Sequence, residues 1–158
     1  MRPSPSPCII IIKEVVGLSI HIRHFKPEEF FCNCSACRSR GAKAAMSPAL
    51  VLLLDQYREA LGYAVKVSSG YRCERHNVTV GGAKSSRHKL GLAADIIIPS
   101  RNSKDREKSE ALLRAFFDRP DWECIIADRY AHVAVPRSFP SGWCGGKVQV
   151  FSWEEKGR

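Results

Sequence analysis

The stretch SSRHKLGLAADI, residues 85–96, places a histidine seven residues before an aspartate, with a glycine and several small residues between them. Small and β-branched residues continue until Pro99, so we expect a strand that ends at this proline. Alternate side chains of a strand share a face, and Asp95 would therefore lie on the same face as Ala93 and Ile97. The segment thus predicts a carboxylate on the surface of a sheet, among small neighbours.

A partly buried carboxylate needs a cationic partner or a metal ion. His88 lies in the loop before the strand, and Gly91 permits the sharp turn that would bring this histidine back toward Asp95. His132 lies within the apolar segment AHVAV, residues 131–135, where a polar ring needs a partner. Two histidines and an aspartate, with one coordination position left for water, are typical of a catalytic zinc site. The residues alone also allow a strand histidine that is merely hydrogen-bonded.

Upstream, the segment SPALVLLLDQYREALG, residues 47–62, has leucines and a tyrosine at helical spacing. Ser47 is a suitable N-cap, Pro48 suits the first helical position, and Gly62 suits the left-handed residue that ends a helix. The next segment, 64–69, alternates valine with polar residues and predicts a short strand. Residues 70–88 are rich in Gly, Ser and Asn and predict an irregular loop.

Downstream, residues 103–118 predict a second helix, with Ser103 as its cap. Further strands are expected at 9–12, 123–127, 131–135 and 147–153. Because helices are segregated from clustered strands, we expect an α+β fold, a single domain with an antiparallel sheet and helices packed on one side. The predicted boundaries are an N-terminal extension with a short strand at 1–20, the domain at 21–153 and a tail at 154–158.

The composition of the 158-residue chain is ordinary for a globular protein, with 44% hydrophobic and 26% charged residues. Its formal net charge is +9, which suits an anionic partner such as nucleic acid, an anionic cell-wall polymer or a membrane surface. The basic residues are spread along the chain, so a nucleic-acid partner is not expected. No apolar run approaches the roughly 20 residues that span a membrane, and we expect no signal peptide at the N-terminus.

The seven cysteines include three within the segment CNCSAC, residues 32–37. Cys73, or alternatively His24, would supply a fourth ligand if this cluster bound a structural metal. The spacing of Cys32 and Cys34 is tighter than the usual two to four intervening residues. Free thiols therefore remain an equal alternative, and disulfides a weaker one because no secretion signal is evident.

Taken together, several of these segments resemble the M15 family of zinc peptidases, with a more distant likeness to the zinc domain of hedgehog proteins. That family includes D-alanyl-D-alanine carboxypeptidases, dipeptidases and phage endolysins that cut the peptides of peptidoglycan. The resemblance covers about residues 24–135, since HFKPEEFFCNCSAC at 24–37 is similar to the N-terminal segment of one branch. Its motif residues here are SGYR at 69–72, then Ser86, His88, Gly91, Ala93 and Asp95, and finally His132.

The resemblance implies a fold like that of hedgehog and DD-peptidase domains. It also implies that His88, Asp95 and His132 bind zinc. Arg72 matches the arginine that receives the carboxylate of the substrate, a task suited to its planar fork. Ser86 matches a serine that lines the substrate pocket, although it would serve equally as a loop residue that bonds its own backbone.

The general base is where the sequence departs from the family pattern. Many members have an acid three residues before the last histidine, but here that residue is Arg129. Another branch places the acid at the end of the preceding strand, where CIIAD at 124–128 puts Asp128. Glu123, at the start of that strand, is the second candidate. The departure leaves an inactive domain as an alternative.

The sequence therefore predicts a zinc metallopeptidase that hydrolyses peptidoglycan stem peptides or cross-links, as a carboxypeptidase or an endopeptidase (endolysin). One alternative is a non-catalytic zinc-binding module of a cell wall or a phage. A second is a basic nucleic-acid-binding protein with cysteine-bound zinc, which leaves the segment 85–96 unexplained. We expect a monomer that is made in the cytoplasm and acts at the bacterial cell wall, whether it is phage-derived or exported.

Overall fold

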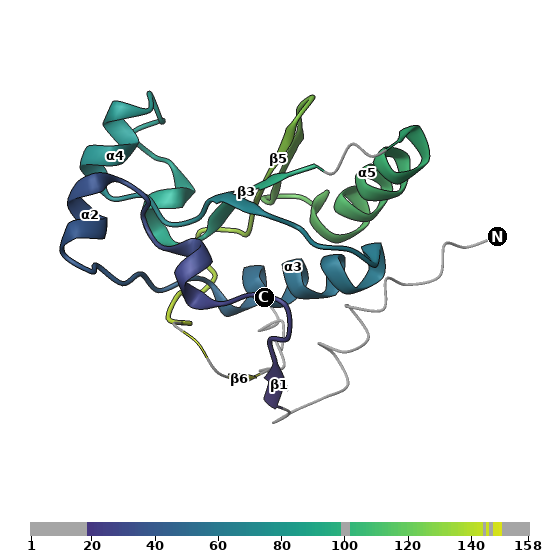
Figure 1. The fold of residues 1–158 in the computed structure, drawn as a ribbon, viewed down its shortest axis with the longest axis horizontal. Helices are drawn as coiled ribbons and strands as arrows, with labels where there is room; N and C mark the ends of the chain where they lie inside the picture. Colours follow the sequence, from purple (N-terminus) through teal and green to yellow (C-terminus); the bar gives the residue numbers. More distant parts are fainter. Residues whose placement is uncertain (1–18, 99–101, 144, 146, 150–158) are drawn as a thin grey trace, which may run out of the picture.

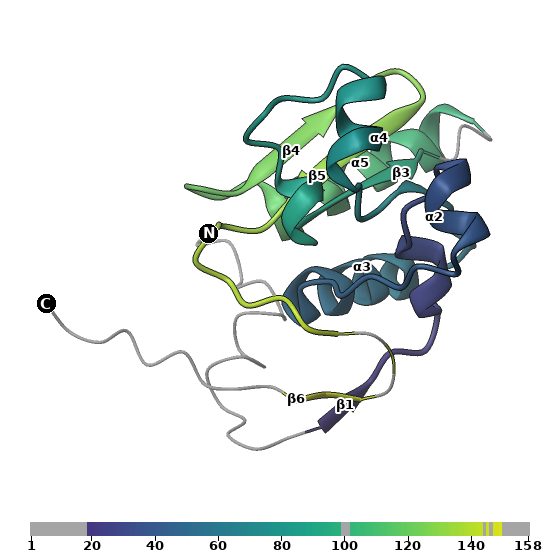
Figure 2. The same cartoon turned by 90° about the vertical axis from the view of Figure 1, so that its left-hand side faces the viewer.

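A computed structural model describes residues 19–98, 102–143, 145 and 147–149. A four-stranded antiparallel sheet forms its centre, with the strand order β2-β3-β5-β4. The strands are β2 (Val67–Ser69), β3 (Ala93–Ile97), β4 (Glu123–Ile126) and β5 (Tyr130–Ala134). Two long helices pack on one side of this sheet, as Figures 1 and 2 show. The expected α+β fold is confirmed.

The first long helix, α3 (Pro48–Leu61), lies beneath the sheet and carries most of the core. It begins as the sequence predicts, because the hydroxyl of Ser47 accepts a hydrogen bond from the amide of Leu50 at 3.3 Å. It ends at Gly62, whose φ of 87° is the left-handed conformation that glycine adopts at low cost. The apolar face of α3 is fully buried against the sheet.

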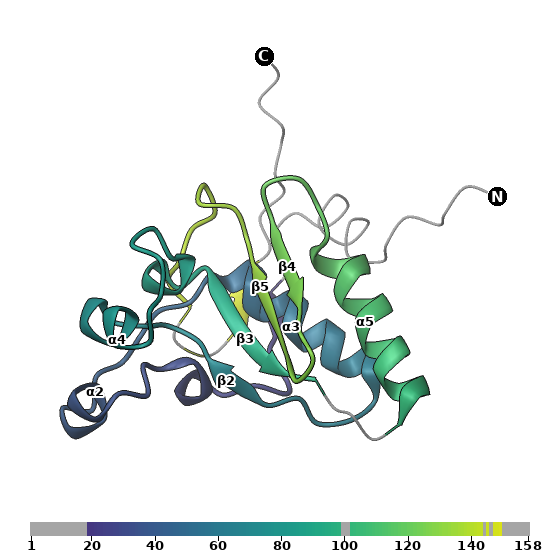
Figure 3. The same ribbon diagram turned by 90° about the horizontal axis from the view of Figure 1, so that it is seen from above.

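The second long helix, α5 (Ser103–Phe117), packs against α3 and against the edge strand β4 (Figure 3). Its cap is Asn102 and not the predicted Ser103. The side-chain oxygen of Asn102 accepts from the amide of Asp105 at 2.9 Å, so the helix starts one residue earlier than a cap at Ser103 would place it. A buried hydrogen bond of 2.6 Å between Tyr57 and Ser109 joins the two helices.

The alternation of side chains along β3 is as predicted. The even-numbered residues Ala94 and Ile96 are fully buried on the face toward α3. Asp95 and Ile97 lie on the other face, which the two long helices leave open. In the register of the sheet, Asp95 is paired with His132 on β5 and with Ser69 on β2. The sheet therefore brings together side chains from three segments on one open surface.

The segment 70–88 is more regular than the predicted loop. It contains the short helix α4 (Glu74–Thr79) and the 3-10 turn η2 (Arg87–Leu90). The thiol of Cys73 caps α4 by accepting from the amide of His76, a role that the sequence pattern of Gly, Ser and Asn did not indicate. On the N-terminal side, η1 (Pro27–Phe30) and α2 (Ser35–Ser39) lead into α3.

A second, two-stranded sheet lies on the far side of α3 from the main sheet (Figure 2). It pairs β1 (Ser19–His21) with β6 (Lys147–Gln149) in antiparallel fashion. The described part of the predicted strand 147–153, residues 147–149, thus pairs with β1 and not with the central sheet. The predicted strand 9–12 and the tail 154–158 lie outside the described residues. In the part of the chain that the structure describes, no helix has the length and apolarity needed to cross a membrane.

Candidate metal centre

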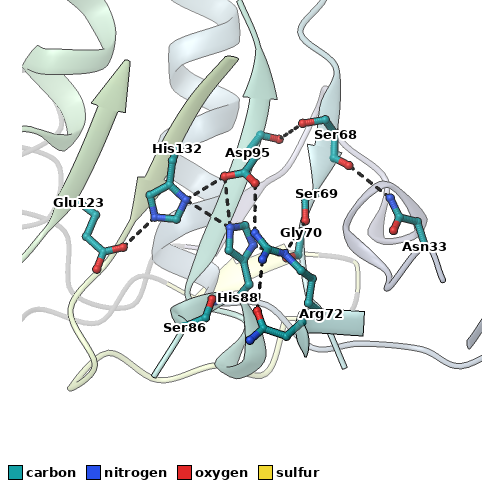
Figure 4. Close-up of polar contacts among 11 residues, drawn as sticks. Asn33, Ser68, Ser69, Gly70, Arg72, Ser86, His88, Asp95, Glu123 and His132 are labelled. Carbon is teal, nitrogen blue, oxygen red and sulfur yellow. Dashed lines mark hydrogen bonds and ion pairs between the residues drawn. The ribbon is translucent and has the colours of Figure 1, made fainter. Parts of the chain in front are cut away.

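The three predicted metal ligands meet on the open face of the sheet (Figure 4). His88 comes from η2, Asp95 from β3 and His132 from β5. Oδ1 of Asp95 lies 3.2 Å from Nε2 of His88 and 2.8 Å from Nδ1 of His132. The two ring nitrogens are themselves 3.2 Å apart. Three candidate ligand atoms, two from the consecutive elements η2 and β3 and one from the more distant strand β5, therefore surround one point.

Neighbouring groups fix which ring atom of each histidine faces this point. Nδ1 of His88 is 2.7 Å from the carbonyl oxygen of Gly70, which only accepts, so Nδ1 carries the proton and Nε2 presents its lone pair. On His132, Nε2 is 2.7 Å from Oε2 of Glu123, which leaves Nδ1 facing Asp95. Such partners on the second ring nitrogen are the usual way in which metal-binding histidines are oriented.

The charges of the cluster are strongly coupled. Burial alone would raise the pKa of Asp95, but the hydrogen bond from His132 and the neighbouring ring of His88 outweigh this effect and hold the pKa well below its ordinary value. Burial acts in the opposite direction on His132 and would lower its pKa, but the hydrogen bonds to Asp95 and Glu123 outweigh burial and raise the pKa. The site therefore holds an ionised carboxylate and favours a positive charge beside it.

The geometry fits a zinc ion. Nitrogen and oxygen ligands about 2.0–2.1 Å from zinc, at the corners of a tetrahedron, lie about 3.3–3.4 Å apart. The separations of 3.2, 3.2 and 2.8 Å among the three atoms are close to this value. His88 is 1% exposed, whereas the side chains of Asp95 and His132 are each 17% exposed. A metal held there would keep one side open to solvent.

Arg72 lies beside the cluster, as predicted. Its Nη2 is 3.2 Å from Oδ2 of Asp95, the oxygen that does not face the histidines. Its Nε donates to the hydroxyl of Ser69 at 3.0 Å, and its Nη1 donates to the side chain of Asn77 at 3.2 Å. Three of the five N–H groups of the guanidinium are thus occupied, and two remain to bind an anion.

Ser86 caps the turn that carries His88, and its hydroxyl accepts from the amide of His88 at 3.3 Å. The sequence allowed two roles for Ser86, in the substrate pocket or as a loop residue that bonds its own backbone, and this contact is the second of them. Ser86 is partly exposed and lies next to the cluster in Figure 4.

The two candidate bases are placed very differently. The side chain of Asp128 is 93% exposed, and its carboxylate lies 3.8 Å from Nη1 of Arg106, away from the cluster. Glu123 contacts His132 directly, and its second oxygen is 3.3 Å from Nε of Arg87. Among the described residues, the structure brings Glu123 to the predicted ligands and leaves Asp128 in the turn between β4 and β5.

Three contributors to the site were not predicted from the sequence. The carbonyl oxygen of Gly70 orients His88, Asn77 holds Arg72 from a position that is 1% exposed, and Arg87 holds Glu123. Gly70 lies within the SGYR motif, and its motif position was the available signal. Asn77 and Arg87 carried none, because the segment containing them was expected to be irregular.

Comparison with known proteins agrees with this geometry. A family model described as Peptidase M15 matches residues 23–133 of the chain. The match includes every residue of the candidate centre, from Gly70 to His132, and agrees with the extent of the resemblance seen in the sequence. No curated protein matches the chain.

Proposed function

The chain belongs to the peptidase M15 family, and from this premise we propose that it is a zinc-dependent peptidase that cuts peptides of peptidoglycan. The observation that carries the proposal is the convergence of His88, Asp95 and His132 around one point, with ligand separations close to those of a tetrahedral zinc site.

The three ligand atoms are Nε2 of His88, Oδ1 of Asp95 and Nδ1 of His132. Zinc bound there would polarise the scissile carbonyl and lower the pKa of a bound water to about 7. The chain contributes the orientation of the ligands through Gly70 and Glu123, and it leaves one side of the centre open to a substrate.

Glu123 is the residue that we propose as the general base. A base must lie within reach of the proton that it accepts. Among the residues that the structure describes, Glu123 and the proposed ligand Asp95 are the carboxylates that contact the cluster. Because Oε2 of Glu123 contacts the edge of the His132 ring opposite the ligand nitrogen, the side chain would have to turn from Nε2 toward the open side of the centre. There it would accept a proton from the attacking water and deliver it to the leaving amine. Arg87, beside its second oxygen, would hold the carboxylate of Glu123 near the site.

Arg72 would bind a carboxylate of the substrate with its two remaining N–H groups. Its contacts to Ser69, Asn77 and Asp95 fix the guanidinium in place, so the substrate would meet a rigid group. Holding the substrate in this way orients the scissile bond and lowers the entropic part of the barrier. Ser86, at the edge of the centre, would line the same pocket.

The substrate class follows from the family and the charge of the chain. Stem peptides of peptidoglycan carry carboxylates, which match Arg72, and the wall of many bacteria is anionic, which matches a net charge of +9. This match supports a cell-wall substrate over a neutral peptide.

The test is digestion of purified peptidoglycan and of defined stem peptides by zinc-loaded protein, with products identified by mass spectrometry. Release of terminal D-alanine would indicate a carboxypeptidase, and splitting of cross-linked dimers an endopeptidase. His88→Ala is the negative control. If the zinc-loaded protein leaves every substrate intact, the chain is a non-catalytic member of its family and the proposal fails.

A further inference from the structure

A second group of metal-ligating side chains lies outside the candidate centre. The Sγ atoms of Cys32, Cys34, Cys37 and Cys73, here termed the thiol cluster, all lie within 4.8 Å of one another. They come from two distant segments, the stretch around α2 and the residue that caps the start of α4. Figure 3 shows these two short helices side by side at one end of the molecule.

The sulfur separations fit one metal ion and not a disulfide. Sγ of Cys34 lies 3.7 Å from that of Cys32 and 3.8 Å from that of Cys73. A disulfide needs about 2.05 Å between the sulfurs. Four thiolates about 2.3 Å from a zinc ion, at the corners of a tetrahedron, lie about 3.8 Å apart. The cluster therefore already has the dimensions of a tetrahedral thiolate site.

The backbone around the cluster explains its unusual spacing. The extended backbone at Phe31 and Cys34 is compatible with this spacing, and the 3.7 Å between the two Sγ atoms shows that Cys32 and Cys34 face one centre with a single residue between them. Cys34 then caps α2, which brings Cys37 onto the same side.

Every sulfur of the cluster has an N–H group nearby. The amide of Cys73 donates to Cys32 at 3.5 Å, and the amide of Cys37 donates to Cys34 at 3.4 Å. The amide of His76 donates to Cys73 at 3.4 Å, and Nη2 of Arg40 lies 3.8 Å from Cys37. Donors of this kind stabilise thiolates and form the outer shell of metal sites.

We propose that the thiol cluster binds a structural zinc ion, separate from the centre formed by His88, Asp95 and His132. Tetrahedral sites of four thiolates hold zinc or iron–sulfur centres. The sulfurs here lie at the spacing of a single ion, which favours zinc over a cluster of several iron atoms.

The proposed ion would join the N-terminal segment to the loop that carries Arg72. Cys73 follows Arg72 directly, and the amide of Tyr71 donates to the carbonyl oxygen of Phe30 at 2.8 Å. If the chain is a peptidase as proposed, this ion would fix the position of Arg72 without contacting the substrate.

The test counts zinc in the His88→Ala variant, which lacks a ligand of the other centre, after purification under reducing conditions. We expect one zinc per chain, and X-ray absorption should show four sulfur neighbours at about 2.3 Å. Adding Cys34→Ser should remove this zinc, whereas adding Cys124→Ala, a free cysteine outside the cluster, should not. These measurements need no substrate, so an inactive enzyme would not affect them.

If the Cys34→Ser variant does not fold, titration of the wild type with a mercurial reagent serves instead. Zinc should be released into a chromogenic chelator as the cysteine thiols react. Each of four outcomes would overturn the proposal. They are the absence of zinc linked to the thiols, an absorption spectrum with nitrogen and oxygen neighbours alone, bound iron in place of zinc, and a disulfide within the cluster.

Discussion

Oε2 of Glu123 lies 2.7 Å from Nε2 of His132, across the ring from the nitrogen that faces Asp95 and His88. This contact gives Glu123 two separable tasks. As a hydrogen-bond acceptor it orients His132 toward the candidate metal centre, and as a carboxylate it can take up a proton. An isosteric amide retains the first task and loses the second.

Glu123→Gln should therefore keep zinc and lose activity. The amide oxygen of glutamine can still accept the proton of Nε2 of His132, but it cannot act as a base. We expect the rate to fall by about 10²–10⁴-fold, with zinc affinity little changed. Glu123→Ala should also weaken zinc binding, by roughly 10–100-fold. If Glu123→Gln is as active as the wild type, Glu123 only orients His132.

Asp128→Asn is expected to leave activity and zinc affinity unchanged. The carboxylate of Asp128 is 93% exposed and lies beside Arg106, so no contact joins it to the cluster. Assays of both variants on the same stem peptide would compare the two bases that the sequence offered. A loss of at least a hundredfold for Asp128→Asn alone would return the role to Asp128.

The positions of the candidate ligands Asp95 and His132 on the sheet could be predicted from the sequence because they depend on simple periodicity. Asp95 is one of the outward-facing residues of a short strand, and His132 interrupts an otherwise apolar strand. Antiparallel pairing then placed them opposite each other. The long helix α3 was equally predictable, since its cap, its apolar spacing and its terminal glycine all agree.

The remaining features depend on contacts between distant segments. Whether Glu123 or Asp128 reaches His132 depends on the register of β4 against β5, in which Glu123 is paired with Ala134. The resemblance of CIIAD to one branch of the family favoured Asp128, but the chain turns between Asp128 and His132. The short helix α4 was missed because its cap is a cysteine, which is not among the common N-cap residues.

Arg72→Lys should reduce kcat/KM by roughly 10–100-fold, because an ammonium cannot make the three contacts of the guanidinium and also bind a carboxylate. Zinc affinity should change little, since the charge beside Asp95 is kept. Arg75→Lys, at an exposed position of α4, is the matched control and should behave as the wild type. Equal kinetics for the two variants would remove Arg72 from the binding site.

Tyr57→Phe tests how the hydrogen bond between Tyr57 of α3 and Ser109 of α5 affects stability as the pH becomes alkaline. Burial raises the pKa of Tyr57 to about 12, against an ordinary value of 10.0. The folded state therefore favours the neutral phenol. The stabilisation that this phenol gives to the folded state is complete below pH 10 and is lost as the pH rises toward 12. The variant lacks the hydrogen bond to Ser109, so it should be about 1–2 kcal/mol less stable at neutral pH. This gap should narrow by about 1.4 kcal/mol per pH unit above 10, as measured by urea unfolding. If the difference in unfolding free energy between the wild type and the variant stays constant above pH 10, the pKa of Tyr57 is not raised by burial.

Gly91 and Gly81 offer a comparison between backbone strain and steric overlap. Both have left-handed φ angles, 70° and 71°. A Cβ at Gly81 would meet no atom within 4 Å, so Gly81→Ala should cost about 1 kcal/mol of unfolding free energy from strain alone. A Cβ at Gly91 would lie 2.2 Å from the carbonyl oxygen of Ala45, which forces the backbone to move. Gly91 ends the turn that carries His88, so Gly91→Ala should destabilise the fold well beyond Gly81→Ala and also weaken zinc binding. Equal unfolding free energies and equal zinc affinities for the two variants would show that the approach of Gly91 to Ala45 does not position His88.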